Sequence, residues 1–108
     1  MGNRESDLTN RIRLHLAEKF PGLICWRNSV GYDDRTKVHY GIGGRGGADL
    51  IGIYRGRFVG IEVKSPGVYT EKERLENQSN FLRAIRDAGG VAGFASSVEE
   101  AEGIINGI

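Results

Sequence analysis

The sequence predicts a single α/β domain in which a mixed central sheet is flanked by helices, in the order αβββαβα. Two segments carry apolar residues at helical spacing, which is typical of helices that bury one face. Shorter apolar runs rich in β-branched residues lie between them and indicate strands. The chain has 108 residues, enough for one core, and shows no internal repeat, so we expect the domain to span residues 1–108.

The first predicted helix covers residues 5–20 and is followed by a short strand over residues 23–27. The apolar stripe of this helix consists of Leu8, Ile12, Leu16 and Phe20. Pro21-Gly22 ends the helix, because neither residue continues it well. Cys25 is the only cysteine and lies in the apolar strand, so we expect a buried, unreactive thiol in a reducing compartment.

Residues 28–47 are polar, rich in glycine and without periodicity, so we expect a long loop there. Within it, Gly41-Ile42-Gly43-Gly44-Arg45-Gly46 matches the G-x-G-x-x-G pattern of dinucleotide-binding turns. That pattern needs a strand before it and a helix after it, whereas a strand is predicted to follow here. We therefore expect no bound dinucleotide.

Two β-rich runs at residues 48–54 and 58–63 surround Arg55-Gly56 and predict a β-hairpin. Both faces of the hairpin carry apolar residues. This pattern indicates that the hairpin lies inside the sheet, with helices covering both sides.

A second helix is expected after Ser65-Pro66-Gly67, with Thr70 as its N-cap and Glu73 completing a capping box. Gly89-Gly90 is expected to end it in the left-handed conformation. The inward stripe of this helix consists of Leu75, Gln78, Leu82 and Ile85. A strand over residues 91–95 and a short last helix capped by Ser97 complete the predicted order.

Three ionisable residues interrupt the hairpin strands. Asp49 lies in the first strand, and Glu62 and Lys64 lie two positions apart in the second, which places those two side chains on one face. If the turn has two residues, Asp49 lies directly across from Glu62 and points to the same face. A three-residue turn would instead place the two carboxylates on opposite faces.

Two carboxylates that converge in a partly buried site repel each other, and a hard divalent cation such as Mg²⁺ or Mn²⁺ is the usual solution. Such a cation suits phosphodiester hydrolysis, because it lowers the pKa of bound water and neutralises charge on phosphoryl oxygens. Lys64 would then position or deprotonate the water, or hold the phosphate. The alternative is a structural ion pair between Lys64 and one acid. The position of Asp49 and the element order favour the metal site.

The chain resembles the VRR-NUC domain of the PD-(D/E)XK nucleases over nearly its whole length. The resemblance lies in Gly47-Ala48-Asp49-Leu50-Ile51-Gly52, in Gly60-Ile61-Glu62-Val63-Lys64-Ser65-Pro66-Gly67 and in Gln78 on the next helix. Glu5 and Trp26-Arg27-Asn28 are similar to the opening helix and first strand of that domain. Ala48 departs from the pattern, because the class name has proline at this position.

The resemblance implies a restriction-endonuclease-like αβββαβ core. It also implies a divalent metal held by Asp49, Glu62 and the backbone carbonyl of Val63, with Lys64 as the catalytic lysine. Compact single-domain members of this kind, often phage-encoded, are similar to Holliday-junction resolvases and act as homodimers on branched DNA. The small size of the chain also favours a homodimer, although the sequence shows no clear interface.

Two further polar residues are expected near this site. Glu5 lies on the inward stripe of the first helix, where it would bind a second metal or its water, and the alternative is an acid favoured by the helix dipole. Gln78 is costly to bury without a partner. We expect that partner to be Lys64, a bound water or a phosphate, in preference to a simple core hydrogen bond.

With 15 basic and 14 acidic residues, the net charge of +1 gives no global attraction to a polyanion, so DNA binding needs local groups or bound metal. Basic and aromatic residues are interleaved in the 28–47 loop and favour a flexible DNA-binding arm, with a merely solvated loop as the alternative. The residues expected to contact DNA are Arg35, Lys37, Tyr40 and Arg45, beside Tyr32 and His39.

These observations favour a magnesium-dependent, structure-specific DNA endonuclease that acts on branched DNA such as four-way junctions, as in DNA repair. A DNA-binding module that kept the nuclease fold without cleavage is the first alternative. A small-molecule enzyme that uses the glycine-rich loop is a weaker one. No apolar run is long enough to span a bilayer and the N-terminal residues are too polar for a secretory signal, so we expect a cytoplasmic protein.

Overall fold

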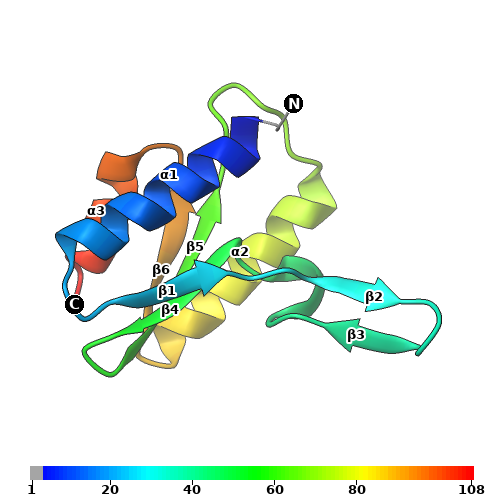
Figure 1. Cartoon of the computed structure of the whole chain (residues 1–108). Coiled ribbons are helices and arrows are strands. Elements are labelled where there is room, and N and C mark those ends of the chain that lie inside the picture. The colour runs from blue at the N-terminus through cyan, green and yellow to red at the C-terminus, as the bar shows by residue number, and fades with distance from the viewer. Residues whose placement is uncertain (1–3) are drawn as a thin grey trace.

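The structure, a computed structural model, describes residues 4–108 with the exception of the side chains of Arg4 and Arg45. Its elements follow the predicted order, with a small hairpin and a 3₁₀ turn inserted after the first strand (Figure 1). They are α1 (Arg4–Lys19), β1 (Ile24–Arg27), β2 (Gly31–Asp33), β3 (Val38–Tyr40), η1 (Gly44–Gly46), β4 (Leu50–Tyr54), β5 (Arg57–Val63), α2 (Lys72–Asp87), β6 (Val91–Ala95) and α3 (Val98–Ile105).

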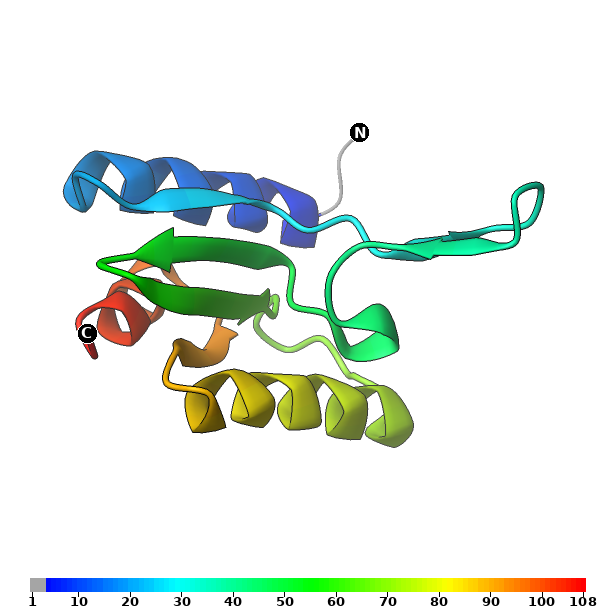
Figure 2. The same ribbon diagram turned by 90° about the horizontal axis from the view of Figure 1, so that it is seen from below.

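A four-stranded mixed sheet forms the centre of the molecule, in the order β1-β4-β5-β6. β1, β4 and β5 pair antiparallel, and β6 pairs parallel to β5. Helices α1 and α3 cover one face of this sheet, and α2 covers the other (Figure 2). The predicted α/β class, with a mixed sheet flanked by helices, is confirmed.

The β4–β5 hairpin lies in the middle of the sheet and turns over two residues, as predicted. Tyr54 pairs with Arg57, and the two residues between them, Arg55 and Gly56, have φ values of 50° and 79°. Positive φ at both positions is the type I′ geometry that matches the twist of adjoining strands. The register, in which Leu50 faces Ile61, places residue 49 across from residue 62 when it is extended by one step.

The two faces of the sheet bury unequal amounts of apolar surface. Under α1 and α3, the buried residues are Leu8, Ile12, Leu16, Leu50, Val59, Ile61, Val63, Ala95, Ala101 and Ile105. Under α2 the buried apolar cluster is smaller and consists of Ala48, Ile51 and Leu82. Leu75 was predicted to face inward, but it is 40% exposed. The first turns of α2 therefore lie over polar residues of the sheet.

The ends of the helices follow the sequence signals with one exception. Gly89 has φ of 99°, Gly90 N–H donates to Ile85 O at 2.9 Å, and α2 therefore ends as predicted. Ser97 Oγ accepts from Glu100 N–H at 3.1 Å and caps α3. The predicted capping box at Thr70 is wrong: the N-cap residue of α2 is Glu71, with no side-chain capping bond.

The predicted long loop over residues 28–47 is only partly correct, because it contains the two-stranded β2–β3 hairpin. Tyr32 of β2 pairs with His39 of β3, and the hairpin projects from the body of the molecule (Figures 1 and 2). Each strand has three residues, which is too short for alternation to register in the sequence. The glycine-rich segment that follows forms η1 and leads directly into β4.

Cys25 is half-buried in β1, and burial raises the pKa of its thiol to about 11. The reactive thiolate is therefore scarce at neutral pH. Within residues 4–108, no helix combines the length and apolar character that crossing a membrane requires.

The space around two glycines, Gly52 in β4 and Gly103 in α3, predicts opposite effects on stability for substitution by alanine. A Cβ at Gly52 would overlap the carbonyl oxygen of Ile24, so Gly52→Ala is expected to lower the free energy of unfolding by about 1–3 kcal/mol. A Cβ at Gly103 in α3 meets nothing within 4 Å, so Gly103→Ala is expected to raise it by about 0.5–1 kcal/mol. Urea unfolding followed by circular dichroism checks both, and equal midpoints for Gly52→Ala and the parent would contradict this packing.

Candidate active site

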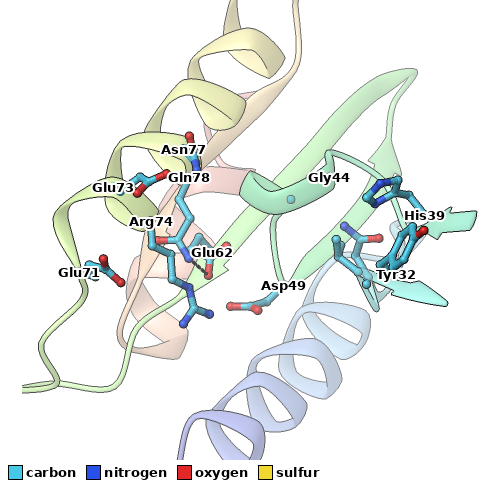
Figure 3. Close-up of a pocket in the computed structure, with 14 residues that line it drawn as sticks. Tyr32, His39, Gly44, Asp49, Glu62, Glu71, Glu73, Arg74, Asn77 and Gln78 are labelled. Atoms are coloured by element: carbon cyan, nitrogen blue, oxygen red, sulfur yellow. Dashed lines mark hydrogen bonds between the residues drawn. The ribbon is translucent and has the colours of Figure 1, made fainter. Parts of the chain in front are cut away.

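A cavity of about 900 Å³ lies on the α2 side of the sheet, bordered by the β2–β3 hairpin. The sheet contributes Asp49 and Glu62 to its lining (Figure 3). Helix α2 and the residue before it contribute Glu71, Glu73, Arg74, Asn77 and Gln78, and the hairpin contributes Tyr32 and His39. Segments that are distant in the sequence therefore meet around the two predicted carboxylates.

Asp49 and Glu62 converge on the face of the sheet that α2 covers. Asp49 lies directly before β4, and Glu62 lies in β5 at the position across from it. Glu62 is only 2% exposed, and Asp49 is near enough to accept a hydrogen bond from its protonated carboxyl group. The predicted juxtaposition of the two carboxyl groups is therefore confirmed.

The surroundings of Glu62 disfavour its charged form. Burial is the largest cause that raises the pKa of Glu62 to about 9, and the charge of Asp49 and the hydrogen bond to it add to this. The charges of Lys64 and Arg74 lower this pKa, but they do not compensate for burial. In the protein alone, Glu62 therefore keeps its proton at neutral pH.

Gln78 of α2 links Glu62 to Lys64. Lys64 Nζ donates to Gln78 Oε1 at 2.7 Å and to Thr70 Oγ1 at 3.1 Å. Gln78 Nε2 donates to Glu62 Oε1 at 3.0 Å. Lys64 was the expected partner of Gln78, and this is confirmed. The Thr70 hydroxyl, which was expected to cap α2, holds the lysine in place instead.

Asp49 is held by the backbone on both sides. Its Oδ2 accepts from Val63 N–H at 2.9 Å, and its carbonyl oxygen accepts from Asn28 N–H at 2.8 Å. The Asn28 amide group donates to Ile42 O and Ala48 O, at 2.7 and 3.0 Å, and accepts from Ile42 N–H at 3.0 Å. Asn28 therefore clamps the base of the hairpin segment to the start of β4. From the sequence, Asn28 was noted only as part of the resemblance.

Arg74 is a cavity residue that the sequence analysis missed. Its guanidinium group extends from α2 toward the carboxyl groups of Asp49 and Glu62 (Figure 3). Its charge is one of the two that lower the pKa of Glu62. Arg74 lies four positions before Gln78, so the two share a helix face, and this spacing is the signal that would have found it.

Other predicted site residues lie elsewhere. Glu5 is on α1, which covers the opposite face of the sheet, and it does not line the cavity. The expected second-metal role of Glu5 therefore has no support in the geometry. Arg35 and Lys37 lie in the turn of the β2–β3 hairpin, Tyr40 is 51% exposed on β3, and none of the three lines the cavity. The side chain of Arg45 lies outside the part of the chain that the structure describes.

The donor atoms of this cavity fit a hard divalent cation. Glu62 Oε2 is buried and accepts no hydrogen bond from the residues that the structure describes. Within the same residues, no group of three or more acidic, histidine or cysteine side chains is arranged around one point. Mg²⁺ binds through one or two carboxylates and completes its shell with waters and phosphate oxygens, so Asp49 and Glu62 suffice for it. The backbone carbonyl of Val63, which the resemblance implies as a ligand, lies next to Glu62 in β5.

No family model matches the chain, and no curated protein matches it. Function is therefore inferred from the residues and their geometry alone.

The raised pKa of Glu62 predicts a specific pH dependence of stability. Between about pH 4.5 and about pH 9 the carboxyl group is protonated in the folded state and ionised in the unfolded chain. Raising the pH through this window therefore favours unfolding. Glu62→Gln removes this titration, so in metal-free buffer the variant is expected to be more stable than the parent near pH 8, with a difference that shrinks toward pH 4.5.

Urea unfolding at a series of pH values measures this difference. Glu76→Gln, at an exposed position of α2, is the matched control and is expected to follow the parent. Parallel pH profiles for the parent and Glu62→Gln would show that Glu62 is ionised in the folded protein.

Proposed function

We propose that this chain is a metal-dependent DNA endonuclease that hydrolyses phosphodiester bonds, with branched DNA such as four-way junctions as its substrate. The observation that carries the proposal is the convergence of the carboxyl groups of Asp49 and the buried Glu62, near the ammonium group of Lys64. The Oε2 atom of Glu62 accepts no hydrogen bond from the described residues. Membership of the VRR-NUC domain family is part of the same proposal. The mixed sheet, the helix order and the position of Gln78 support it.

The charge of the cavity supports a requirement for metal. Among the side chains that the structure describes, its lining contains the four carboxyl groups of Asp49, Glu62, Glu71 and Glu73 and one guanidinium group, that of Arg74. A phosphate group that approached these carboxylates would be repelled. When bound, Mg²⁺ or Mn²⁺ would offset this charge, act as a Lewis acid on the phosphoryl oxygen and lower the pKa of a bound water.

Each residue of the site has a distinct role in this proposal. Asp49 is aligned by the Val63 N–H group and would bind the cation through its other oxygen. Glu62 would release its proton and bind through Oε2, with Oε1 still hydrogen-bonded to Gln78. The raised pKa of Glu62 makes cation binding and proton release coupled events.

In this proposal Lys64 acts on the water or the phosphate. An ammonium group has three N–H donors, and Gln78 and Thr70 accept from two of them. The third is left for the attacking water or for a phosphate oxygen. In the reaction the water oxygen attacks phosphorus, the bond from phosphorus to the leaving sugar oxygen breaks, and the proton lost by the water balances the one that this oxygen gains.

The β2–β3 hairpin supports DNA as the substrate. It projects from the body, and its turn carries Arg35 and Lys37 (Figure 2). The side chain of Arg35 is 92% exposed and Tyr40 is 51% exposed, so both are accessible to a nucleic-acid backbone. In this proposal these residues contact DNA phosphates outside the cavity and offset the low net charge of the chain. Arg45 remains an expected phosphate contact from the sequence.

Cleavage assays test the proposal. With Mg²⁺, the parent is expected to cut branched DNA, and Asp49→Asn and Lys64→Met are each expected to slow cutting by about 100-fold or more, because each removes a group that acts on the reacting phosphate or water. Removal of metal by a chelator is expected to abolish cutting. A gel assay on four-way, flap, splayed and fully paired DNA measures the rates.

Lys72→Met is the matched control, since Lys72 is an exposed lysine at the start of α2. It is expected to cut as fast as the parent. If Asp49→Asn cuts at the parent rate, the site is misassigned. Tight DNA binding without metal-stimulated cutting would favour the non-catalytic DNA-binding module.

The proposed homodimer has a supporting surface at one edge of the sheet. Ile24 and Trp26 of the edge strand β1 are 62% and 42% exposed, and Ile53, which pairs with Ile24, is 45% exposed. These three residues, the edge patch, lie on one face of the sheet, because Ile24 and Trp26 are two positions apart in β1 and Ile53 pairs with Ile24. An apolar edge strand is prone to association with a second chain.

Substitution in the edge patch tests the dimer. Ile24→Lys is expected to shift the sedimenting species from dimer to monomer at micromolar concentration, because it places a charge on the surface that the partner would bury. Leu14→Lys, at a 60% exposed position of α1, is the control and is expected to leave the dimer intact. A parent protein that sediments as a monomer would contradict the proposal.

A further inference from the structure

The β2–β3 hairpin carries two aromatic rings on one face. Tyr32 and His39 are directly paired across the two strands, and their ring centroids are 4.6 Å apart with an interplanar angle of 53°. Tyr32 is 45% exposed and His39 is also exposed, so the rings are accessible to a ligand. The side chain of the next residue, Tyr40, points to the other face, because successive side chains of a strand alternate. We call Tyr32 and His39 the ring pair.

The ring pair lines the same cavity as Asp49 and Glu62. Figure 3 shows the two rings side by side on the hairpin, with the Asp49 carboxylate between them and the side chains of α2. The other predicted DNA contacts of the hairpin, Arg35, Lys37 and Tyr40, do not line this cavity. The ring pair is therefore distinct from the basic turn of the hairpin, although both belong to one hairpin.

The hairpin is attached to the carboxylate site at its base. Asn28 donates its backbone N–H to the Asp49 carbonyl, and its side chain bonds to Ile42 just beyond β3. The two chain segments that enter and leave the hairpin are thus tied to the residue that begins β4. This connection holds the ring pair in a defined position relative to the cleavage site.

We infer that the ring pair stacks an unpaired nucleobase of the strand whose phosphate reaches Asp49 and Glu62. This inference rests on the proposed function and narrows its substrate to DNA with an unstacked nucleotide beside the bond that is cut. A base inside a continuous duplex has neighbours on both faces and offers no free face to a protein ring. Base stacking on aromatic side chains is independent of sequence and of charge, so it suits a cavity lined with carboxyl groups.

Stacking can be measured apart from cutting with the fluorescent base 2-aminopurine, whose emission falls when it stacks. The probe is a flap substrate with 2-aminopurine unpaired at the branch, bound in Ca²⁺ in place of Mg²⁺ so that it stays intact. The parent is expected to quench the probe. Tyr32→Leu is expected to lose the quenching and to bind the flap about 10-fold more weakly, while its binding to a fully paired duplex of the same sequence stays at the parent level.

Three further variants serve as comparisons. Tyr32→Phe keeps the ring and is expected to keep the quenching. Tyr69→Leu removes a tyrosine that is 84% exposed and outside the cavity lining, and it is expected to behave as the parent. Tyr40→Leu removes the ring on the other face of β3, and it is expected to leave the quenching in place. Equal urea midpoints for Tyr32→Leu and the parent show that the loss does not arise from unfolding.

The outcomes separate the inference from the proposed function. Cutting that depends on Asp49 would support the proposed function. If Tyr32→Leu then keeps the parent's preference for flap over duplex DNA, the inference alone is overturned. Equal loss of flap and duplex binding in Tyr32→Leu, or equal loss of quenching in Tyr40→Leu, would also overturn it. If the parent binds the free 2-aminopurine nucleotide as tightly as the flap, the ring pair is a site for a small ligand, and the inference is overturned as well. Absence of any Asp49-dependent cutting would overturn the proposed function, while quenching still reports on the ring pair.

Discussion

The carboxyl groups of Asp49 and Glu62 face each other on one side of the sheet, and Glu62 is almost fully buried. The rest of the site is arranged around the repulsion that two negative charges would feel there. Burial and the charge of Asp49 keep Glu62 protonated in the protein alone. The site therefore holds a group whose charged form is unfavourable until a cation arrives. Local instability of this kind is typical of functional sites, where the surrounding fold supplies the stability that the site lacks.

One face of the sheet carries most of the apolar core, and the other face carries the candidate site. The larger apolar cluster lies under α1 and α3, whereas α2 packs on a smaller one and places polar residues over the sheet. The start of α2 has no apolar cluster beneath it. Leu75 is therefore exposed, whereas Gln78 is buried against the polar residues of the sheet. The type I′ turn at Arg55-Gly56 then sets the register that brings residues 49 and 62 to this second face.

Most of the fold followed from local signals in the sequence. Helical spacing located α1 and α2, the two-residue turn gave the register of the central hairpin, and Gly89 and Ser97 marked helix ends. Two elements depended on tertiary contacts that no local pattern encodes. The β2–β3 strands are too short to show alternation, and Thr70 has a capping sequence but bonds to Lys64 instead.

The candidate site was predicted less completely than the fold. Asp49, Glu62 and Gln78 line one cavity, and Lys64, which does not line it, bonds to Gln78. Strand register and helix spacing already relate these four residues in the sequence. Asn28, Arg74 and the ring pair enter through the packing of the hairpin segment and α2 around the cavity, which single-chain spacing does not specify. Glu5 lies on α1, which covers the other face of the sheet, and it does not line the cavity.

The bridging amide of Gln78 has an electrical consequence. A direct contact between Lys64 and Glu62 would let the two share a proton, and each would then neutralise the other. An amide neither gains nor loses a proton near neutral pH, so Gln78 hydrogen-bonds to both groups without passing a proton from one to the other. Lys64 and Glu62 therefore hold their protons independently, and a cation that displaces the proton of Glu62 leaves the proton of Lys64 in place.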